Sequence, residues 1–208
     1  MPAIAPLTES EATDKIEQTY GRINEMLGTD SVPDPFLLYG RVPAFLQDFF
    51  MNSKRFVFSD GKLPAKTKGL IALAVASKER SSIWADWLTE YCHKLGWSDT
   101  ETTDVRAVAG ACAMYNTFFK FRDLAGRDIF QGMSVGLRAH TFAGTSLDEL
   151  TVELVNVVIS DLNSCHACVS GHVAKAVELG ASEEAILEAI QCAATMMAGT
   201  TFHTAAGY

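Results

Sequence analysis

An internal repeat constrains the fold of this 208-residue chain more than any other sequence feature. When the chain is shifted by 84 positions against itself, KLGWSDTE at 94–101 aligns with ELGASEEA at 178–185. Each half reads as helix, tight turn, helix, a turn with glycine and a serine cap, and a further alanine-rich helix. Identities are few, so the ordered pattern is what predicts a duplication. One copy covers about 63–125 and the other about 147–203.

Helical periodicity dominates the chain. Capping boxes predict helix starts at Thr8-x-x-Glu11, Ser98-x-x-Glu101 and Ser146-x-x-Glu149. After the first box, an apolar stripe indicates one amphipathic helix that ends near Gly28; its members are Ile16, Tyr20, Ile23 and Leu27. Pro33 and Pro35 break the pattern, and a second helical run covers roughly 35–57.

The apolar runs GLIALAVAS and VELVNVVIS contain β-branched residues, but their capped starts and helical neighbours favour buried helices. We therefore expect an all-α protein. Residues 1–60 form an N-terminal helical extension, and residues 61–208 form a domain made of the two repeats.

Composition narrows the function classes. A net charge of −8, without a dense basic cluster, argues against a nucleic-acid partner. No stretch approaches the ~20 apolar residues of a membrane span. Near the N-terminus, acidic residues occur before any apolar segment that could form the core of a signal peptide. Five cysteines are an odd, scattered set, which speaks against a secreted disulfide framework. We expect a cytoplasmic protein.

The segment CHACVSGH at 165–172 concentrates the reactive residue types. Asn163 or Ser164 can cap a helix that begins there, and the positive end of a helix dipole stabilises a cysteine thiolate. Cys165, Cys168 and His172 share one helical face, because they are three and four positions apart. His172 can take and return the proton of Cys168, as in an activated nucleophile.

Glu153 lies on the preceding apolar helix, on the far side of the DLNS turn. A carboxylate among valines and a leucine is costly to bury alone, so a neighbouring histidine would explain why it is tolerated. In the other repeat, Ser81, Trp84 and Leu88 replace the two cysteines and the histidine. If the repeat is real, the chemistry survives in one copy only.

Other interpretations of the motif compete with a reactive dithiol. Cys165 and Cys168 could form a structural disulfide, or bind zinc with His172 and a fourth ligand such as Glu153 or His166. Structural zinc usually recruits a second, distant ligand pair, and the chain has no other CxxC. Three further cysteines sit in apolar helical patterns and are predicted to be core residues: Cys92, Cys112 and Cys192. Phenylalanines 118, 119 and 121 are predicted to be core or subunit-interface residues.

The combination of Glu153, Cys165-x-x-Cys168 and His172 resembles the AhpD family within the carboxymuconolactone decarboxylase superfamily. The likeness covers roughly residues 60–202, and AMYNTFFKFRDLAG at 113–126 is similar to the family's MxNxFYRF segment. It implies an all-helical duplicated fold, a homo-oligomer that is often a trimer, and alkylhydroperoxidase activity. It also implies no bound cofactor or metal, with an external dithiol reductant such as dihydrolipoamide, which a lipoyl-bearing protein could carry.

Carried over residue by residue, the resemblance makes Cys168 the peroxidatic nucleophile and Cys165 the resolving thiol. His172 becomes the base, and Glu153 is coupled to it in a proton relay. AhpD proteins place a second histidine directly before the second cysteine, where this chain has Ala167, so His166 is an accessory candidate only. The alternatives are a general thiol-disulfide oxidoreductase and a non-catalytic helical oligomer with a zinc or disulfide staple.

Overall fold

The computed structural model describes residues 4–207, and these residues fold as helices joined by turns and loops, without strands. The all-α prediction is therefore confirmed. The longer helices are α1 (Asp14–Leu27), α3 (Pro43–Phe56), α4 (Ala65–Lys78), α5 (Ser82–Lys94), α6 (Asp99–Ala125), α9 (Glu149–Leu162), α10 (His166–Glu178) and α11 (Glu183–Ala206). Short helical turns are α2 (Asp34–Leu37), α7 (Asp128–Gln131) and α8 (His140–Ala143), with 3-10 turns at Glu9–Glu11 and Leu38–Arg41.

Two groups of three helices are related by the shift seen in the sequence. Moving α4 and α5 along the chain by 84 positions gives the bounds of α9 and α10, and α6 then begins where α11 begins. The turns agree as well. Arg80 and Ser164 have φ angles of 58° and 55°, and Gly96 and Gly180 have 84° and 97°. We propose on this basis that the two groups are copies of one unit.

The two groups pack across one another, α4 against α11 and α6 against α9. Backbone amides before α4 and α9 repeat the same contact. The Lys62 N–H donates to Glu188 on α11, at 2.7 Å, and the Ser146 N–H donates to Asp104 on α6, also at 2.7 Å. Fully buried leucines, isoleucines, valines and alanines of α4 and α9 fill the space between the groups.

Some predicted helix starts were wrong, because a different residue caps the helix or because the expected cap forms a hydrogen bond elsewhere. Ser98 forms its capping box as expected. Thr8 also forms one, but it starts only the 3-10 turn, and α1 begins after Thr13. Ser146 donates to Asp104, so Asp148 caps α9 instead. The run expected at 35–57 breaks at Val42, before Pro43 starts α3.

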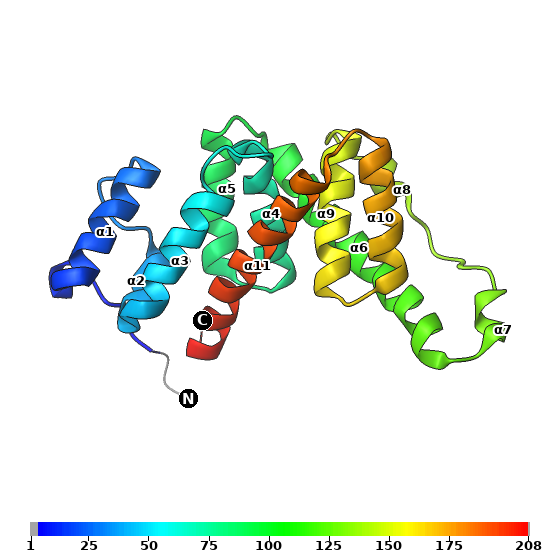
Figure 1. The fold of residues 1–208 in the computed structure, drawn as a ribbon, viewed down its shortest axis with the longest axis horizontal. Coiled ribbons are helices and arrows are strands. Elements are labelled where there is room, and N and C mark those ends of the chain that lie inside the picture. Colours follow the sequence, from blue (N-terminus) through cyan, green and yellow to red (C-terminus); the bar gives the residue numbers. More distant parts are fainter. Residues whose placement is uncertain (1–3, 208) are drawn as a thin grey trace.

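Residues 4–60 cover the first group of helices, at one end of the long axis in Figure 1. The amphipathic helix α1 ends at Gly28, in the left-handed conformation, as predicted. Tyr39 and Phe49 pack on Trp84, and the indole N–H of Trp84 donates to the Tyr39 hydroxyl at 2.7 Å. The backbone of Ile4 donates to the carbonyl of Ala206, which brings the two described ends of the chain together.

The opposite end of the molecule is formed by the last turns of α6 and by α7, which extend away from the helical body (Figure 1). Large apolar side chains of this segment are exposed: Phe121, Leu124, Ile129 and Met133. We call residues 121–133 the apolar arm. The chain returns from it to α8, which packs on α6.

Candidate active site

The two cysteines of the motif lie at the turn between α9 and α10. The turn closes through the Cys165 N–H, which donates to the carbonyl of Ser160 at 3.0 Å. Helix α10 begins at His166, with Cys165 itself as the N-cap residue. The expected side-chain cap was therefore wrong: Asn163 ends α9, and Ser164 takes the left-handed conformation between the helices. Cys168 still lies in the first turn of α10, at its positive end.

Cys165 and Cys168 are joined as a disulfide. Their exposures differ, since Cys165 is fully buried while 8% of Cys168 is exposed. Cys168 lines a cavity, and Cys165 is not among the lining residues. Of the two sulfurs, the one that a small molecule can approach through this cavity therefore belongs to Cys168.

His172 and Glu153 form a direct contact between α10 and α9. The Nδ1 atom of His172 lies 2.7 Å from Oε2 of Glu153, and both side chains are mostly buried. A carboxylate at this distance orients the imidazole ring. Since Nδ1 is engaged, Nε2 is the ring nitrogen left for exchange with a thiol. His172 lines the same cavity as Cys168.

The cavity has a volume of about 270 Å³ and is walled mainly by apolar groups. Besides Cys168 and His172, its lining consists of Tyr115, Phe119, Phe142, Ala167 and Gly171. Phe119 was expected in the core or a subunit interface, and the structure places it at this wall. Tyr115 and Phe142 were missed by the sequence reasoning, because α6 and α8 reach the motif only through the tertiary fold. The Tyr115 hydroxyl donates to the carbonyl of Leu137, which fixes that side of the wall.

His166 is exposed and is not among the residues that line the cavity. The helix geometry explains this, because His166 is two positions before Cys168 and so points to another side of α10. The structure thus brings together Cys168, Cys165, His172 and Glu153, and leaves His166 outside this group.

The three remaining cysteines are buried free thiols, as predicted. Burial raises the pKa of Cys92 and Cys192 to about 12 and that of Cys112 to about 11. These thiols are therefore protonated near neutral pH and poor nucleophiles. Within residues 4–207, no group of three or more His, Cys, Asp or Glu side chains is placed to hold a metal ion.

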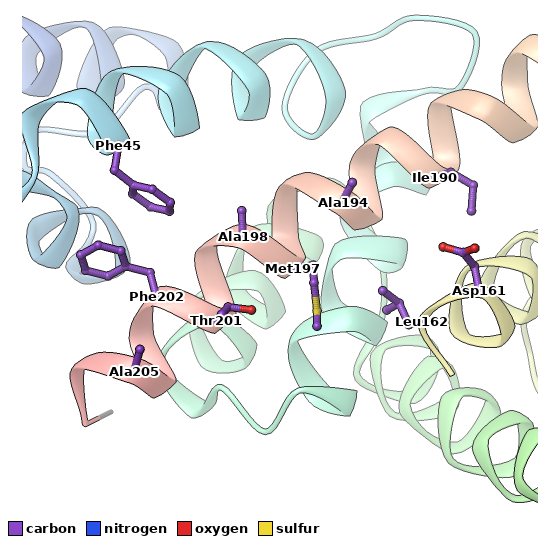
Figure 2. Close-up of a pocket in the computed structure, with 10 residues that line it drawn as sticks. All are labelled: Phe45, Asp161, Leu162, Ile190, Ala194, Met197, Ala198, Thr201, Phe202 and Ala205. Carbon is purple, nitrogen blue, oxygen red and sulfur yellow. The ribbon is translucent and has the colours of Figure 1, made fainter. Parts of the chain in front are cut away.

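A larger cavity, of about 650 Å³, lies away from the dithiol. Figure 2 shows it along the exposed side of α11, where Ala194, Ala198 and Ala205 form a floor of small side chains. Phe45 and Phe202 stand at one end, and Asp161 and Leu162 at the other. It contains no cysteine or histidine, so its size does not make it the reactive site.

No helix within the described part of the chain combines the length and apolar character needed to cross a bilayer.

The family model and the curated relatives that match this chain point to the same family. Residues 130–208 match the carboxymuconolactone decarboxylase family. The chain is similar to the alkyl hydroperoxide reductase AhpD of Anaeromyxobacter sp. (strain Fw109-5), with 32% identity over 157 residues, 76% of this chain and 84% of the relative. It is 28% identical to the protein of the same name from Koribacter versatilis, over 76% of this chain and 81% of the relative. Together with the helical fold, these relationships show that the chain belongs to the AhpD family within the carboxymuconolactone decarboxylase superfamily.

Proposed function

We propose that this protein reduces alkyl hydroperoxides through a dithiol–disulfide cycle of Cys168 and Cys165, with His172 and Glu153 as a proton relay. The observation that carries the proposal is the shared cavity: the accessible cysteine and the histidine held by a carboxylate line one small apolar space. The curated relatives are named alkyl hydroperoxide reductases, which supports the same chemistry.

The first step is deprotonation of Cys168. His172, four positions further along α10, takes the thiol proton through Nε2, and Glu153 stabilises the imidazolium through Nδ1. The first turn of α10 favours the thiolate through its exposed amide groups. The charge pair thus forms beside a mainly apolar wall.

The thiolate then attacks the terminal peroxide oxygen. A sulfur–oxygen bond forms, the O–O bond breaks, and the alkoxide leaves as the alcohol after taking the proton held by His172. Cys168 becomes a sulfenic acid. Cys165 attacks this sulfur, a disulfide forms and water leaves. An external dithiol, such as dihydrolipoamide free or on a lipoyl-bearing protein, supplies two electrons and two protons and restores both thiols.

The shape of the cavity supports an organic peroxide as substrate. A volume of about 270 Å³ accommodates a compact organic tail, and the aromatic rings of Tyr115, Phe119 and Phe142 offer it apolar contact. Hydrogen peroxide would gain none of this contact. We therefore propose that apolar hydroperoxides are preferred.

A homo-oligomer, trimeric or higher, remains part of the proposal. The exposed apolar side chains of the arm support it, because such a cluster is unfavourable in water and is typical of an association surface. Sedimentation velocity on the wild type and on Leu124→Ser would test it. A monomeric wild type would contradict it.

Peroxide consumption by the purified protein tests the main proposal, with dihydrolipoamide compared against thioredoxin and glutathione as reductant. We expect turnover with cumene hydroperoxide and dihydrolipoamide, no turnover in Cys168→Ser, and a single turnover ending in sulfenic acid in Cys165→Ser. Equal multi-turnover rates in both variants would refute the assigned roles. Disulfide exchange without peroxide consumption would favour a general thiol-disulfide oxidoreductase.

A further inference from the structure

A buried polar cluster lies behind the dithiol, and the proposed mechanism does not use it. The Nδ2 amide of Asn116 on α6 donates to the Ser160 hydroxyl at 2.9 Å, and the Asn116 Oδ1 accepts from Asn163 at 3.0 Å. Lys120, one turn further along α6, donates through Nζ to the backbone carbonyl of Asn163 at 2.9 Å. Asn116 and Ser160 are fully buried. Helix α6 thus holds the turn before Cys165 from two positions.

The other repeat lacks this cluster. Shifting by 84 positions replaces Asn116 and Lys120 with Thr200 and Thr204, and the hydroxyl of Thr200 donates to the carbonyls of its own helix instead. In the same way Ala76 stands in place of Ser160, and Glu79 in place of Asn163. The polar contacts therefore accompany the dithiol and are absent where Ser81 and Trp84 replace it.

The backbone conformation of the turn also occurs in the repeat that lacks the cluster. In the repeat without it, Arg80 takes the same left-handed conformation as Ser164, and the Ser81 N–H donates to Ala76 at 3.0 Å, as the Cys165 N–H does to Ser160. One copy adopts this turn without the polar side chains. The backbone conformation alone therefore does not explain why the other copy has them. Burying them is favourable only when they are paired, and such networks fix one arrangement.

We propose that Asn116 and Lys120 are positioning residues of the dithiol, a role that rests on the redox function proposed above. Asn116 holds the turn that places Cys165, and Lys120 holds its ammonium group at the carbonyl of Asn163, two residues before Cys165 in the turn between α9 and α10. That charge attracts a thiolate and has no such effect on a disulfide. Lys120 therefore favours the reduced pair and makes the couple more oxidising.

Other titratable side chains on these helices include Glu153 and Asp161 on α9, His166 and His172 on α10, and Cys112 on α6. They remain unchanged in the variants below.

Reduction by dithiothreitol breaks the Cys165–Cys168 bond and transfers two electrons from the reagent, which closes its own disulfide. The protein is left with one thiol and one thiolate, and one proton is released.

The test measures this equilibrium at pH 7 in dithiothreitol redox buffers, by alkylation of the full-length protein without peroxide. Lys120→Met should shift the equilibrium about tenfold towards the disulfide, or about 30 mV for two electrons. Lys120→Arg should stay within twofold of the wild type. Lys66→Met is the matched control, because Lys66 also donates to a turn carbonyl, that of Gly96, in the repeat without the dithiol. A Lys120→Met equilibrium within twofold of the wild type would overturn the role of Lys120.

Hydrogen exchange tests Asn116 within one molecule. In Asn116→Ala, the amide of Cys165 should exchange at least tenfold faster, while the equivalent amide of Ser81 keeps its wild-type rate. Faster exchange at both sites would mean general destabilisation, and unchanged exchange at Cys165 would mean that the turn does not need Asn116. Either result would overturn the role of Asn116. Both measurements are independent of peroxide consumption, so a failed peroxidase assay would refute the proposed function alone.

Discussion

His172 on α10 and Glu153 on α9 meet at 2.7 Å although they are 19 positions apart in the chain. The contact joins the helix that carries the dithiol to the helix before it. It also fixes which ring nitrogen of His172 faces the carboxylate, so the ring cannot turn freely in the cavity. The proposed acid–base pair is thus oriented in the absence of substrate.

Replacing the carboxylate tests this pair. Glu153→Gln keeps the size and a hydrogen-bonding oxygen but removes the charge that stabilises the imidazolium. We expect peroxide turnover with a dithiol reductant to fall about tenfold to a hundredfold. Glu149→Gln is the control, one turn earlier on α9, since the Glu149 side chain is 66% exposed. Equal rates in the wild type and Glu153→Gln would remove Glu153 from the relay.

The histidine should control the reactivity of Cys168. In a Cys165→Ser background, the only thiols besides Cys168 are the buried ones with raised pKa values, so alkylation reports on Cys168. Adding His172→Ala removes the base and should move the midpoint of the alkylation rate to higher pH. An unchanged midpoint would mean that the start of α10 alone activates the thiol.

The cavity wall should select substrates by their apolar tail. Phe119→Ala removes one aromatic ring from the lining. We expect the KM for cumene hydroperoxide to rise about fivefold to tenfold, equivalent to about 1 kcal/mol of lost apolar contact, while the rate with hydrogen peroxide is unchanged. Phe121→Ala is the matched control, because Phe121 is half exposed and lies outside the cavity. Equal losses with both peroxides would contradict selection by this wall.

Sequence reasoning was most successful where local pattern decides. The shift of 84 positions relates the observed helix bounds, and the spacing of Cys168 and His172 places both at one cavity. It failed where distant residues compete. Asp104 draws Ser146 away from the expected cap, and Tyr115 and Phe142 reach the cavity only through tertiary packing. No local signal marks such contacts.

The packing of the N-terminal extension could not be predicted from the local sequence pattern. Its Tyr39 and Phe49 lie over Gly199, where the other repeat has Tyr115 at the cavity wall. In the repeat without the dithiol, aromatic side chains of the extension thus fill the space that corresponds to the cavity lined by Cys168 and His172. Trp84, which stands in place of Cys168, is fully buried beneath them.

Gly199→Ala should destabilise the protein. A Cβ atom there would lie 2.6 Å from both the Tyr39 hydroxyl oxygen and a ring carbon of Phe49. Overpacking of this kind costs about 1–3 kcal/mol, which chemical denaturation measures. Gly110→Ala is the matched control on α6, where a Cβ meets nothing within 4 Å; it should be neutral or stabilising by up to about 1 kcal/mol. Similar effects of both changes would show that the extension does not pack tightly on α11.

Burial of Cys192 makes stability depend on alkaline pH. Its pKa is raised from 9.0 to about 12 by burial, so above pH 9 the unfolded chain releases a proton that the folded chain keeps. The free energy of unfolding therefore falls as pH rises from about 9 towards 12, and the stabilisation is fully present below pH 9. At pH 10 this thiol should account for roughly 1 kcal/mol of the loss. Urea unfolding at pH 8 and pH 10, with reductant present, should thus show a smaller pH-dependent loss in Cys192→Ala than in the wild type. Contributions from the other buried thiols and the tyrosines cancel in this comparison. Equal losses in the two proteins would mean that Cys192 titrates alike in the folded and unfolded chains.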